Sequence, residues 1–501
     1  MKATLLSIAL LSSLCSAEPQ RAYSPFFPRL EKKVLDEIQL QAQAEAKAES
    51  SEERVTFIDD CSKYTDCGSC ASASSLFVPC RWCPKFDDVS CHQVGSLSNS
   101  CESDEQIVEP DQCPPLAAVR KPTIILPGLI GSNLEARLTD KPNKPSPVCS
   151  TNSDWFTVWI SGYEIAPEFY KCMFDNIELN YDAATESVTN NPGVEVQAPS
   201  YGASVDAVEC LVPDSSKLCG MTSNWNHFIK AMQAKGYVVG KDLFSAPFDF
   251  RMGEKQFMKE DWPKLKALVE EVYDLNNGTP VAFVSISYGG PFGGAFLTDF
   301  VDEAWKAKYI DSFVSLSGVF NGAPMVAHQL ISGMPAYGLS WIDEVALRDA
   351  MRSWPAFPWL LPTYVPDDPN DEGGDRIIMY TDVHNYTLSE LPELLEAAGA
   401  TAAADIKRKQ KIAPVGDPGV KVHCWFTEDM PTEWGYYQAM ENITAPPGIL
   451  YGVGDGTADK SSLNRCENWS NVEVRKFSNV SHSAYLGRED ILDDVVALLA
   501  Q

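Results

Sequence analysis

Residues 281–290 of the chain read VAFVSISYGG. Five of the first six residues are apolar, and a run this short suits a strand that is buried on both faces. A strand that turns sharply into a helix here would hold Ser287 on a tight elbow, with its hydroxyl clear of the backbone as a nucleophile requires. The pattern is G-x-S-x-G with Ser285 in place of the first glycine. By itself it fits a buried strand followed by a glycine-rich loop equally well.

Predicted strands and helices alternate on both sides of this stretch. The helical spacing of apolar residues at 261–275 and 489–499 predicts two amphipathic helices. Short apolar runs predict four further strands, at 123–126, 310–317, 420–426 and 448–451. Strands that alternate with helices form a mostly parallel sheet covered on both faces, so we expect an α/β fold.

Length, charge and the N-terminal residues indicate a soluble chain of the secretory pathway. The 501 residues, 45% of them apolar, suffice for a large core and more than one domain. The formal net charge of -29 argues against a nucleic-acid partner, because like charges repel. Residues 1–17 read as a signal peptide whose apolar run is too short to span a bilayer. We expect the mature chain in the extracellular space or in the lumen of a lysosome or vacuole.

Cysteine usage and glycosylation motifs agree with an oxidising compartment. Removal of Cys15 with the signal peptide leaves fourteen of the 15 cysteines, an even number that suits disulfide pairing. Five N-x-S/T sequons fit a secreted glycoprotein; they begin at Asn277, Asn385, Asn442, Asn468 and Asn479.

A cysteine-rich segment at 57–115 follows a polar linker or pro-segment at 18–56. Two C-x-x-C pairs, Cys67/Cys70 and Cys80/Cys83, are compatible with zinc. Their separation is short for a zinc ribbon, and the other cysteines would remain unexplained, so disulfides are favoured. The spacing of the segment resembles a plexin-semaphorin-integrin (PSI) module. That resemblance implies a spacer between domains and leaves open a protein partner that binds through it.

An acid and a base must accompany a nucleophilic serine, and in α/β-hydrolases they follow it in the order acid, histidine. His482 lies in a polar loop just before the last predicted helix, where the base is expected. Asp455 directly follows an apolar run, and a carboxylate at the carboxyl end of a parallel strand faces the edge where ligands bind. The alternative for Asp455 is a simple D-G turn. Asp417 and Asp459 are weaker candidates, because neither directly follows a strand.

Two backbone amides are needed to stabilise the oxyanion of a tetrahedral intermediate. One should belong to Tyr288, directly after the nucleophile, and the other to the loop after an earlier strand. The sequence Pro-Gly-Leu at 127–129 makes the Leu129 amide the candidate.

With these residues placed, the chain resembles the lecithin:cholesterol acyltransferase and lysosomal phospholipase A2 family across residues 116–501. The matching stretches are IILPG (124–128), GSNLEA (131–136), APFDFR (246–251), the Ser287 elbow, GDGT (454–457) and the His482 loop. The chain departs from the family at Ser285 and at Ile286, where histidine is common. Serine is small, so we expect modest strain and retained activity. Arg251 is expected to brace the core through Asp249.

The resemblance implies an α/β-hydrolase with cap and lid insertions that needs no cofactor or metal. Ser287 would take an acyl chain from a glycerophospholipid, with His482 as base and Asp455 orienting the imidazole. The acyl group would then pass to a lipid alcohol, such as a sterol, or to water. The implied partners are a phospholipid membrane or lipoprotein surface and an acyl-acceptor lipid.

The family also implies the disulfides Cys149–Cys172 and Cys424–Cys466. Cys210 and Cys219 are only nine residues apart, and this short separation favours an additional disulfide between them. The stapled loop at 149–172 contains Trp155, Phe156 and Trp159, which fit either a core or a surface that docks on lipid. The resemblance implies the lipid surface, with Trp159 near the acyl-binding cleft, and a mobile lid at about 332–346.

Two other functions fit parts of the sequence. A decayed hydrolase fold joined to the cysteine-rich segment would give a non-catalytic extracellular binding protein. The altered elbow at Ser285 is its only support, and the retained serine, aspartate and histidine argue against it. A secreted serine esterase for other esters would keep these three residues but would have no need of an apolar stapled loop.

Overall fold

The computed structural model of the chain describes residues 61, 70, 74–75, 78–83, 91–93, 120–164, 166–213, 217, 219, 222–333, 343–366, 374–409 and 415–500. The predicted signal peptide, the polar segment at 18–56, most of the cysteine-rich segment and most of the predicted lid lie outside these residues. Within the described ranges, no helix is long and apolar enough to cross a membrane.

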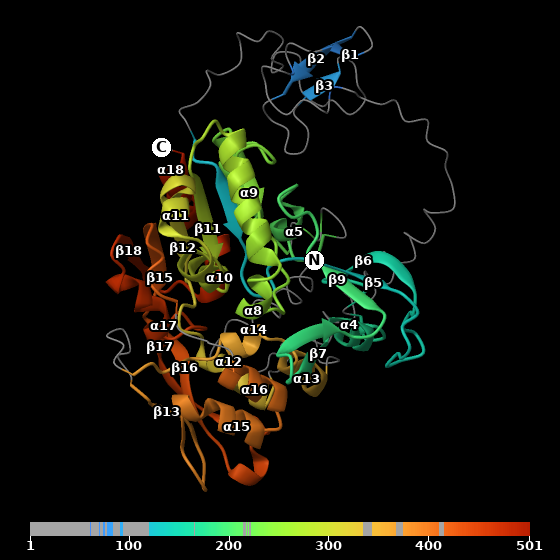
Figure 1. Cartoon of the computed structure of the whole chain (residues 1–501), viewed down its shortest axis with the longest axis vertical. Coiled ribbons are helices and arrows are strands. Elements are labelled where there is room, and N and C mark those ends of the chain that lie inside the picture. Colours follow the sequence, from blue (N-terminus) through green and yellow to red (C-terminus); the bar gives the residue numbers. More distant parts are fainter. Residues whose placement is uncertain are drawn as a thin grey trace, which may run out of the picture.

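A six-stranded sheet forms the centre of the fold (Figure 1). Each pair of neighbouring strands is parallel, which confirms the predicted α/β class. The strands are, in spatial order, β10 (Leu243–Ser245), β4 (Thr123–Leu126), β11 (Val281–Ile286), β12 (Ile310–Leu316), β15 (Lys421–Thr427) and β18 (Val472–Phe477). This sheet, with helices on both of its faces, gives the chain an α/β-hydrolase fold.

Strand β11 is buried along its whole length, and its side chains alternate between two cores. Phe283 packs in the larger, aromatic core, whereas Val284 and Ile286 pack in the core on the opposite face. A strand covered on both sides has no polar face, which explains why residues 281–286 read as an almost unbroken apolar run.

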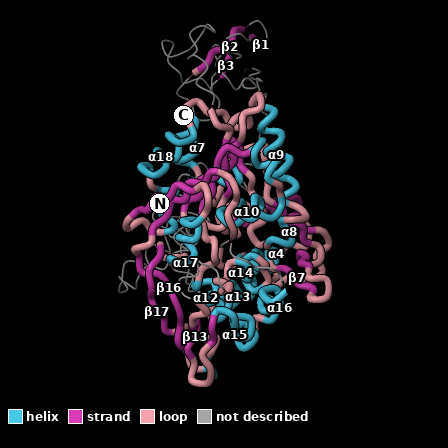
Figure 2. The backbone as a smooth tube through the Cα atoms, turned by 60° about the vertical axis from the view of Figure 1, so that its left-hand side comes forward, coloured by secondary structure: helices cyan, strands magenta, loops and turns pink. Residues whose placement is uncertain are grey.

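Helices cover both faces of the central sheet (Figure 2). One face carries α7 (Asn226–Ala234) and α18 (Glu489–Leu499), and the other carries α9 (Asp261–Leu275), α10 (Gly289–Ala295) and α11 (Glu303–Tyr309). Helices α9 and α18 have the bounds that the sequence predicted, because each presents one continuous apolar stripe to the sheet.

A second sheet of four strands lies beyond the carboxyl end of the central sheet (Figure 1). Its strands are, in spatial order, β14 (Tyr386–Thr387), β13 (Ile377–Tyr380), β16 (Met430–Tyr437) and β17 (Gly448–Gly454). The nearby helices are α12 (Pro324–Ile331), α13 (Glu344–Arg352), α14 (Ala356–Trp359), α15 (Leu391–Ala397) and α16 (Thr401–Lys409). The predicted strand at 448–451 exists, but its expected place in the parallel sheet was wrong. It belongs to β17, which pairs antiparallel with β16.

A third, three-stranded sheet packs with helix α4 (Tyr170–Ile177) and consists of β6 (Ser153–Trp159), β5 (Leu134–Leu138) and β9 (Val194–Gln197). The hairpin β7 (Leu179–Asp182) and β8 (Ser187–Asn190) follows α4. Arg251 braces this region as predicted. Its buried guanidinium donates two hydrogen bonds, of 2.9 and 2.6 Å, to Asp249 and one of 3.1 Å to the Ile177 carbonyl.

Disulfides join the three cysteine pairs that the sequence suggested, Cys149–Cys172, Cys210–Cys219 and Cys424–Cys466. In the cysteine-rich segment, Cys61 bonds to Cys80 and Cys70 bonds to Cys91, beside the short strands β1 (Ser74–Ser75), β2 (Val78–Trp82) and β3 (Cys91–Gln93). Cys83 is also disulfide-bonded. These bonds exclude the zinc alternative for the sulfurs they use, and the PSI resemblance stays a prediction.

Candidate active site

The strand order of the central sheet reverses at β4. The chain runs from β4 outward to β10 and then returns to β11 on the other side of β4. Ligands of open parallel sheets bind at such a switch point, beyond the carboxyl ends of the strands. The two loops that leave this point carry Leu129, after β4, and Ser287, after β11.

Ser287 occupies a strained turn between β11 and α10. Its φ angle of 54° lies in the left-handed region, which is costly for a residue other than glycine and is frequent at functional turns. Gly289 is sterically required, because a Cβ atom there would lie 2.3 Å from the carbonyl oxygen of Leu126. Ser285, the departure from the family pattern, is buried and donates a 3.4 Å hydrogen bond to the Val314 carbonyl. Strand β11 therefore accommodates it.

The loop after β4 folds into a tight turn against the nucleophile. The amide of Gly131 donates a 3.0 Å hydrogen bond to the carbonyl of Gly128, which closes the turn around Leu129. A Cβ atom on Gly128 would lie 3.2 Å from Cβ of Ser287. Among the residues that the structure describes, the amides of Leu129 and Tyr288 donate to no protein acceptor. Two available amides beside a serine are what an oxyanion hole needs.

Asp455 and His482 form a buried pair. The Oδ2 of Asp455 lies 2.6 Å from Nδ1 of His482, and the two side chains are 0% and 2% exposed. The other carboxylate oxygen accepts hydrogen bonds from the amides of Thr457 (3.0 Å) and Ala458 (2.9 Å). An ionised carboxylate only accepts hydrogen bonds, so Nδ1 carries the proton and Nε2 is left as the basic nitrogen.

Nε2 of His482 is buried and makes no hydrogen bond within the described part of the chain. Its contact with the Ser287 hydroxyl is therefore not formed in this conformation. Contacts of this kind often tighten only when substrate binds. A buried acceptor without a hydrogen bond is costly. Nε2 of His482 is therefore free to accept a hydrogen bond from a hydroxyl group that approaches it.

The β16–β17 hairpin carries Asp455 back to the edge of the central sheet. Strand β15 ends at Thr427, β16 begins at Met430, and Met430 pairs with Gly454 at the end of β17. Asp455 was predicted at the carboxyl end of a parallel strand, and that placement was wrong. It follows an antiparallel strand whose last residue returns to the place where β15 ends.

The two weaker acid candidates have other partners. Asp459 is buried and forms a 3.0 Å ion pair with Arg376. Asp417 accepts hydrogen bonds from the amides of Gly419 and Ser470. The sequence also gave no indication of Thr432, whose hydroxyl accepts a 2.9 Å hydrogen bond from the Gly456 amide, next to Asp455. Thr432 lies 24 residues from Gly456, and no short-range motif connects them.

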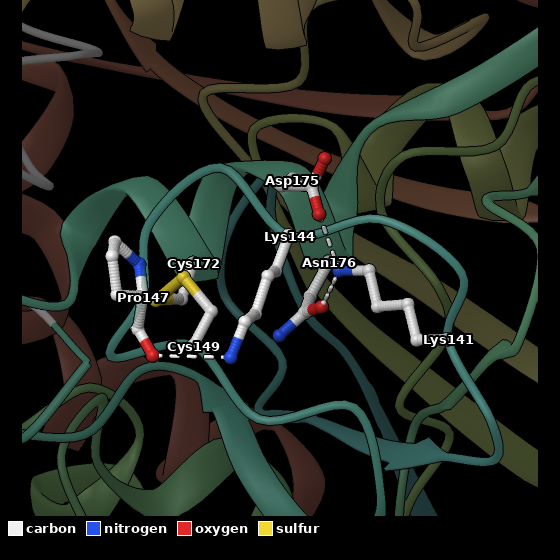
Figure 3. The surroundings of a disulfide bond; sticks show 7 residues. All are labelled: Lys141, Lys144, Pro147, Cys149, Cys172, Asp175 and Asn176. Carbon is white, nitrogen blue, oxygen red and sulfur yellow. Dashed lines mark hydrogen bonds and ion pairs between the residues drawn. A yellow bond between two sulfur atoms is a disulfide. The ribbon is translucent and has the colours of Figure 1, made fainter.

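The stapled loop combines exposed and buried aromatic side chains. Figure 3 shows the Cys149–Cys172 disulfide that closes it. Trp155 is 37% exposed, and Phe156 is half-buried against the core. Trp159 is only 2% exposed and packs against Phe250, so it is not a surface contact in this conformation, and its predicted place near the acyl-binding cleft stays a prediction. Its indole donates a 3.4 Å hydrogen bond to the carbonyl of Ile130, in the loop that carries Leu129.

A buried acidic side chain lies within the stapled loop. Burial raises the pKa of Glu164 to about 8, and the nearby Lys141 ammonium only partly offsets this effect. Lys141 is itself buried and binds Asp175 and Asn176 of α4 (Figure 3). Glu164 is therefore uncharged at acidic pH.

Comparisons with known proteins found similar structures and similar sequences. Among solved structures, the complex titled Tle4-Tli4 aligns with 76% of this chain and 99% of its own at 12% identity and a TM-score of 0.41. Several curated relatives are 30% identical to this chain. The "Lysosomal phospholipase A and acyltransferase" of Bos taurus aligns over 75% of this chain and 88% of its own. The "Phosphatidylcholine-sterol acyltransferase" of Gallus gallus aligns over 71% and 83%.

The "Lecithin-cholesterol acyltransferase-like 1" of Arabidopsis thaliana is 29% identical over 75% of this chain and 88% of its own. The family model described as lecithin:cholesterol acyltransferase matches residues 155–394. Those residues include the Ser287 elbow and most of the stapled loop. The chain therefore belongs to the lecithin:cholesterol acyltransferase family.

Proposed function

We propose that the chain is a phospholipid acyltransferase and phospholipase A that works through an acyl-serine intermediate. Ser287 Oγ attacks the carbonyl carbon of a glycerophospholipid ester while Nε2 of His482 takes the hydroxyl proton. The amides of Leu129 and Tyr288 stabilise the oxyanion that forms. The bond to the glycerol oxygen then breaks, and that oxygen takes the proton from His482 as the lysophospholipid leaves.

The second half of the reaction repeats these steps with an acceptor. A lipid alcohol or water gives its proton to Nε2 of His482, and its oxygen attacks the acyl-serine carbonyl. The bond to Ser287 Oγ breaks, and the serine recovers its proton from the imidazolium. Asp455 stabilises the imidazolium in both halves, because its carboxylate accepts the Nδ1 hydrogen bond.

The observation that carries this proposal is the Asp455–His482 pair, with its unsatisfied Nε2, together with the two available amides beside Ser287. The names of the relatives from Bos taurus and Gallus gallus support phospholipid as the acyl donor. Exposed apolar side chains in or next to the stapled loop support a lipid surface as its source. They are Val148 (49% exposed), Trp155 (37%) and Tyr163 (51%).

A secretory location is part of this proposal. The five sequon asparagines are all exposed, as N-glycosylation requires. The disulfides of the described residues support an oxidising compartment. The name of the bovine relative supports the lumen of a lysosome or vacuole, and extracellular space is the alternative.

Incubation with phospholipid liposomes, with and without a sterol or another lipid alcohol, tests the function. We expect lysophospholipid to appear together with an acylated acceptor or free fatty acid, and we expect Ser287→Ala to form neither. Mass spectrometry of the products identifies the acceptor. Turnover of soluble short-chain esters without any phospholipid turnover would favour a general serine esterase.

Labelling by a fluorophosphonate distinguishes an enzyme from a binding protein. The folded wild type should be labelled at Ser287, and Ser287→Ala should remain unlabelled. A folded wild type that resists labelling favours the non-catalytic binding role.

A further inference from the structure

A buried ion pair lies next to the acid of the proposed triad, outside the residues that the chemistry uses. Arg376 and Asp459 are joined at 3.0 Å, and their side chains are 9% and 1% exposed. Asp459 lies four residues after Asp455. The two residues of the pair are 83 positions apart in the chain, so the fold brings them together.

The backbone between Asp455 and Asp459 determines how the triad carboxylate is oriented. Asp459 forms an isolated bridge with Gly454, and the Asp455 amide donates a 3.2 Å hydrogen bond to the Ala458 carbonyl. The amides of Thr457 and Ala458 hold one carboxylate oxygen and leave the other for His482. A displacement of the Asp459 end would therefore change the distance between the carboxylate and the imidazole.

Arg376 connects this loop to the adjacent strand. Its guanidinium stacks 3.6 Å above the Trp434 ring, donates to the Trp434 carbonyl on β16, and donates to Oδ2 of Asp459. A planar, delocalised cation is well suited to stacking and forked hydrogen bonding at the same time. The loop is therefore fixed to β16 at Asp459 by Arg376 and at Gly456 by Thr432.

Stability alone does not explain this pair. Buried ion pairs are often no more stabilising than apolar side chains of similar size, because both charges lose their hydration. Burial raises the pKa of Asp459 more than Arg376 lowers it, and Oδ1 of Asp459 is buried without a hydrogen bond. A costly arrangement therefore lies at the loop that orients the carboxylate of Asp455.

We propose that Arg376 is a positioning residue that acts through Asp459 to hold Asp455 against His482. The inference rests on the proposed function only in requiring that Asp455, His482 and Ser287 form the catalytic triad. It does not depend on which lipid is the substrate. A soluble ester and fluorophosphonate titration of active sites can therefore test it.

The first test is Arg376→Gln, measured on a soluble ester with the concentration of active sites titrated. We expect kcat to fall about tenfold to a hundredfold with KM unchanged, because small misplacements of catalytic groups have effects of this size. The acidic limb of the pH–activity profile should move to lower pH, since a displaced carboxylate stabilises the imidazolium less. Arg376→Lys should restore part of kcat.

Arg120→Gln is the matched control. Arg120 forms a 3.1 Å ion pair with Asp242, a carboxylate that is also largely buried, at the opposite end of the central sheet. Its loss should lower the melting temperature without changing kcat per active site or the pH profile.

The second test removes both charges in the variant Arg376→Met/Asp459→Leu. We expect a melting temperature close to or above that of the wild type, together with the same loss of kcat as in Arg376→Gln. Stability and activity would then change independently, which a purely structural role does not allow. Unchanged kcat in either folded variant overturns the positioning role alone. A folded wild type that fluorophosphonate does not label overturns the proposed function and this inference with it.

Discussion

The two sides of the proposed catalytic site are built in different ways. On the nucleophile side, Ser287 and Gly128 lie in loops that leave adjacent strands of one sheet, and short-range features fix their geometry. On the acid side, Asp455 depends on a hairpin of another sheet and on side chains far away in the sequence. Local patterns therefore predict the first side, whereas only the folded chain reveals the second.

Asp455→Asn should have the largest effect. The substitution keeps the shape of the side chain but removes the charge that fixes the Nδ1 tautomer of His482, and kcat on a soluble ester should fall about 10⁴-fold. Asp417→Asn is the control, because Asp417 caps backbone amides and does not contact His482. A loss of less than tenfold in Asp455→Asn would contradict the assignment of the acid.

Gly128→Ala tests the nucleophile side. The new Cβ would lie 3.2 Å from Cβ of Ser287 and 3.4 Å from the carbonyl oxygen of Ile286, so the two loops must separate slightly. We expect kcat to fall about a hundredfold, because the oxyanion donors and the nucleophile lose their relative placement. Gly416→Ala is the control, since an added Cβ there meets only one atom, at 4.0 Å. Circular dichroism should show both variants folded.

Sequence patterns predicted β4, β11, β12 and β15 of the central sheet and the helices α9 and α18, because each of these elements carries its own apolar pattern. Strands β10 and β18 at the two edges of the sheet were not predicted. Helices α9 and α18 agree residue for residue, and β11 ends at Ile286, directly before Ser287. The order of serine, aspartate and histidine also selected Asp455 and His482, whose side chains the fold joins at 2.6 Å. Their catalytic roles, and those of Leu129 and Tyr288, stay predictions.

Pairing partners and burial of aromatic residues could not be predicted in the same way. An apolar strand at 448–451 does not specify its neighbour, so β17 was placed in the wrong sheet. Trp155 and Trp159 are the same residue type in the same strand, yet only the side chain of Trp155 is exposed. The Arg376–Asp459 pair has no motif at all, because two residues 83 positions apart give no local pattern.

Thr432→Val should have a smaller effect on the acid side. Valine keeps the volume but leaves the buried amide of Gly456 without its 2.9 Å acceptor, at a cost of about 1–3 kcal/mol. We expect kcat to fall about tenfold or less and the melting temperature to fall measurably. Thr123→Val, which removes a buried hydroxyl bonded to the Lys121 carbonyl at the other end of the sheet, should change stability only. Equal losses of kcat in both variants would show that activity does not depend more on the hydrogen bonds near Asp455 than on those at the other end of the sheet.

Glu164→Gln should leave both sides of the site unchanged and alter only the response of stability to pH. Burial raises the pKa of Glu164 in the folded state to about 8, whereas the unfolded chain releases this proton near the ordinary glutamate pKa of 4.5. Between these two pKa values the folded state therefore binds more protons than the unfolded state. The contribution of Glu164 to stability is complete below the pKa of the unfolded state. This contribution is lost as pH rises through the pKa of the folded state, at up to about 1.4 kcal/mol per pH unit.

Glutamine is neutral at every pH and removes this loss. Thermal unfolding at pH 5 and pH 8 should show a smaller difference for Glu164→Gln than for the wild type, with kcat on a soluble ester unchanged. Glu195→Gln, at an exposed position, should keep the wild-type difference. If Glu164→Gln kept it as well, the carboxyl would be charged in the folded protein at both pH values. A smaller difference, as we expect, would show that the buried carboxyl of the stapled loop is neutral in the folded protein at low pH, so that the loop is most stable there.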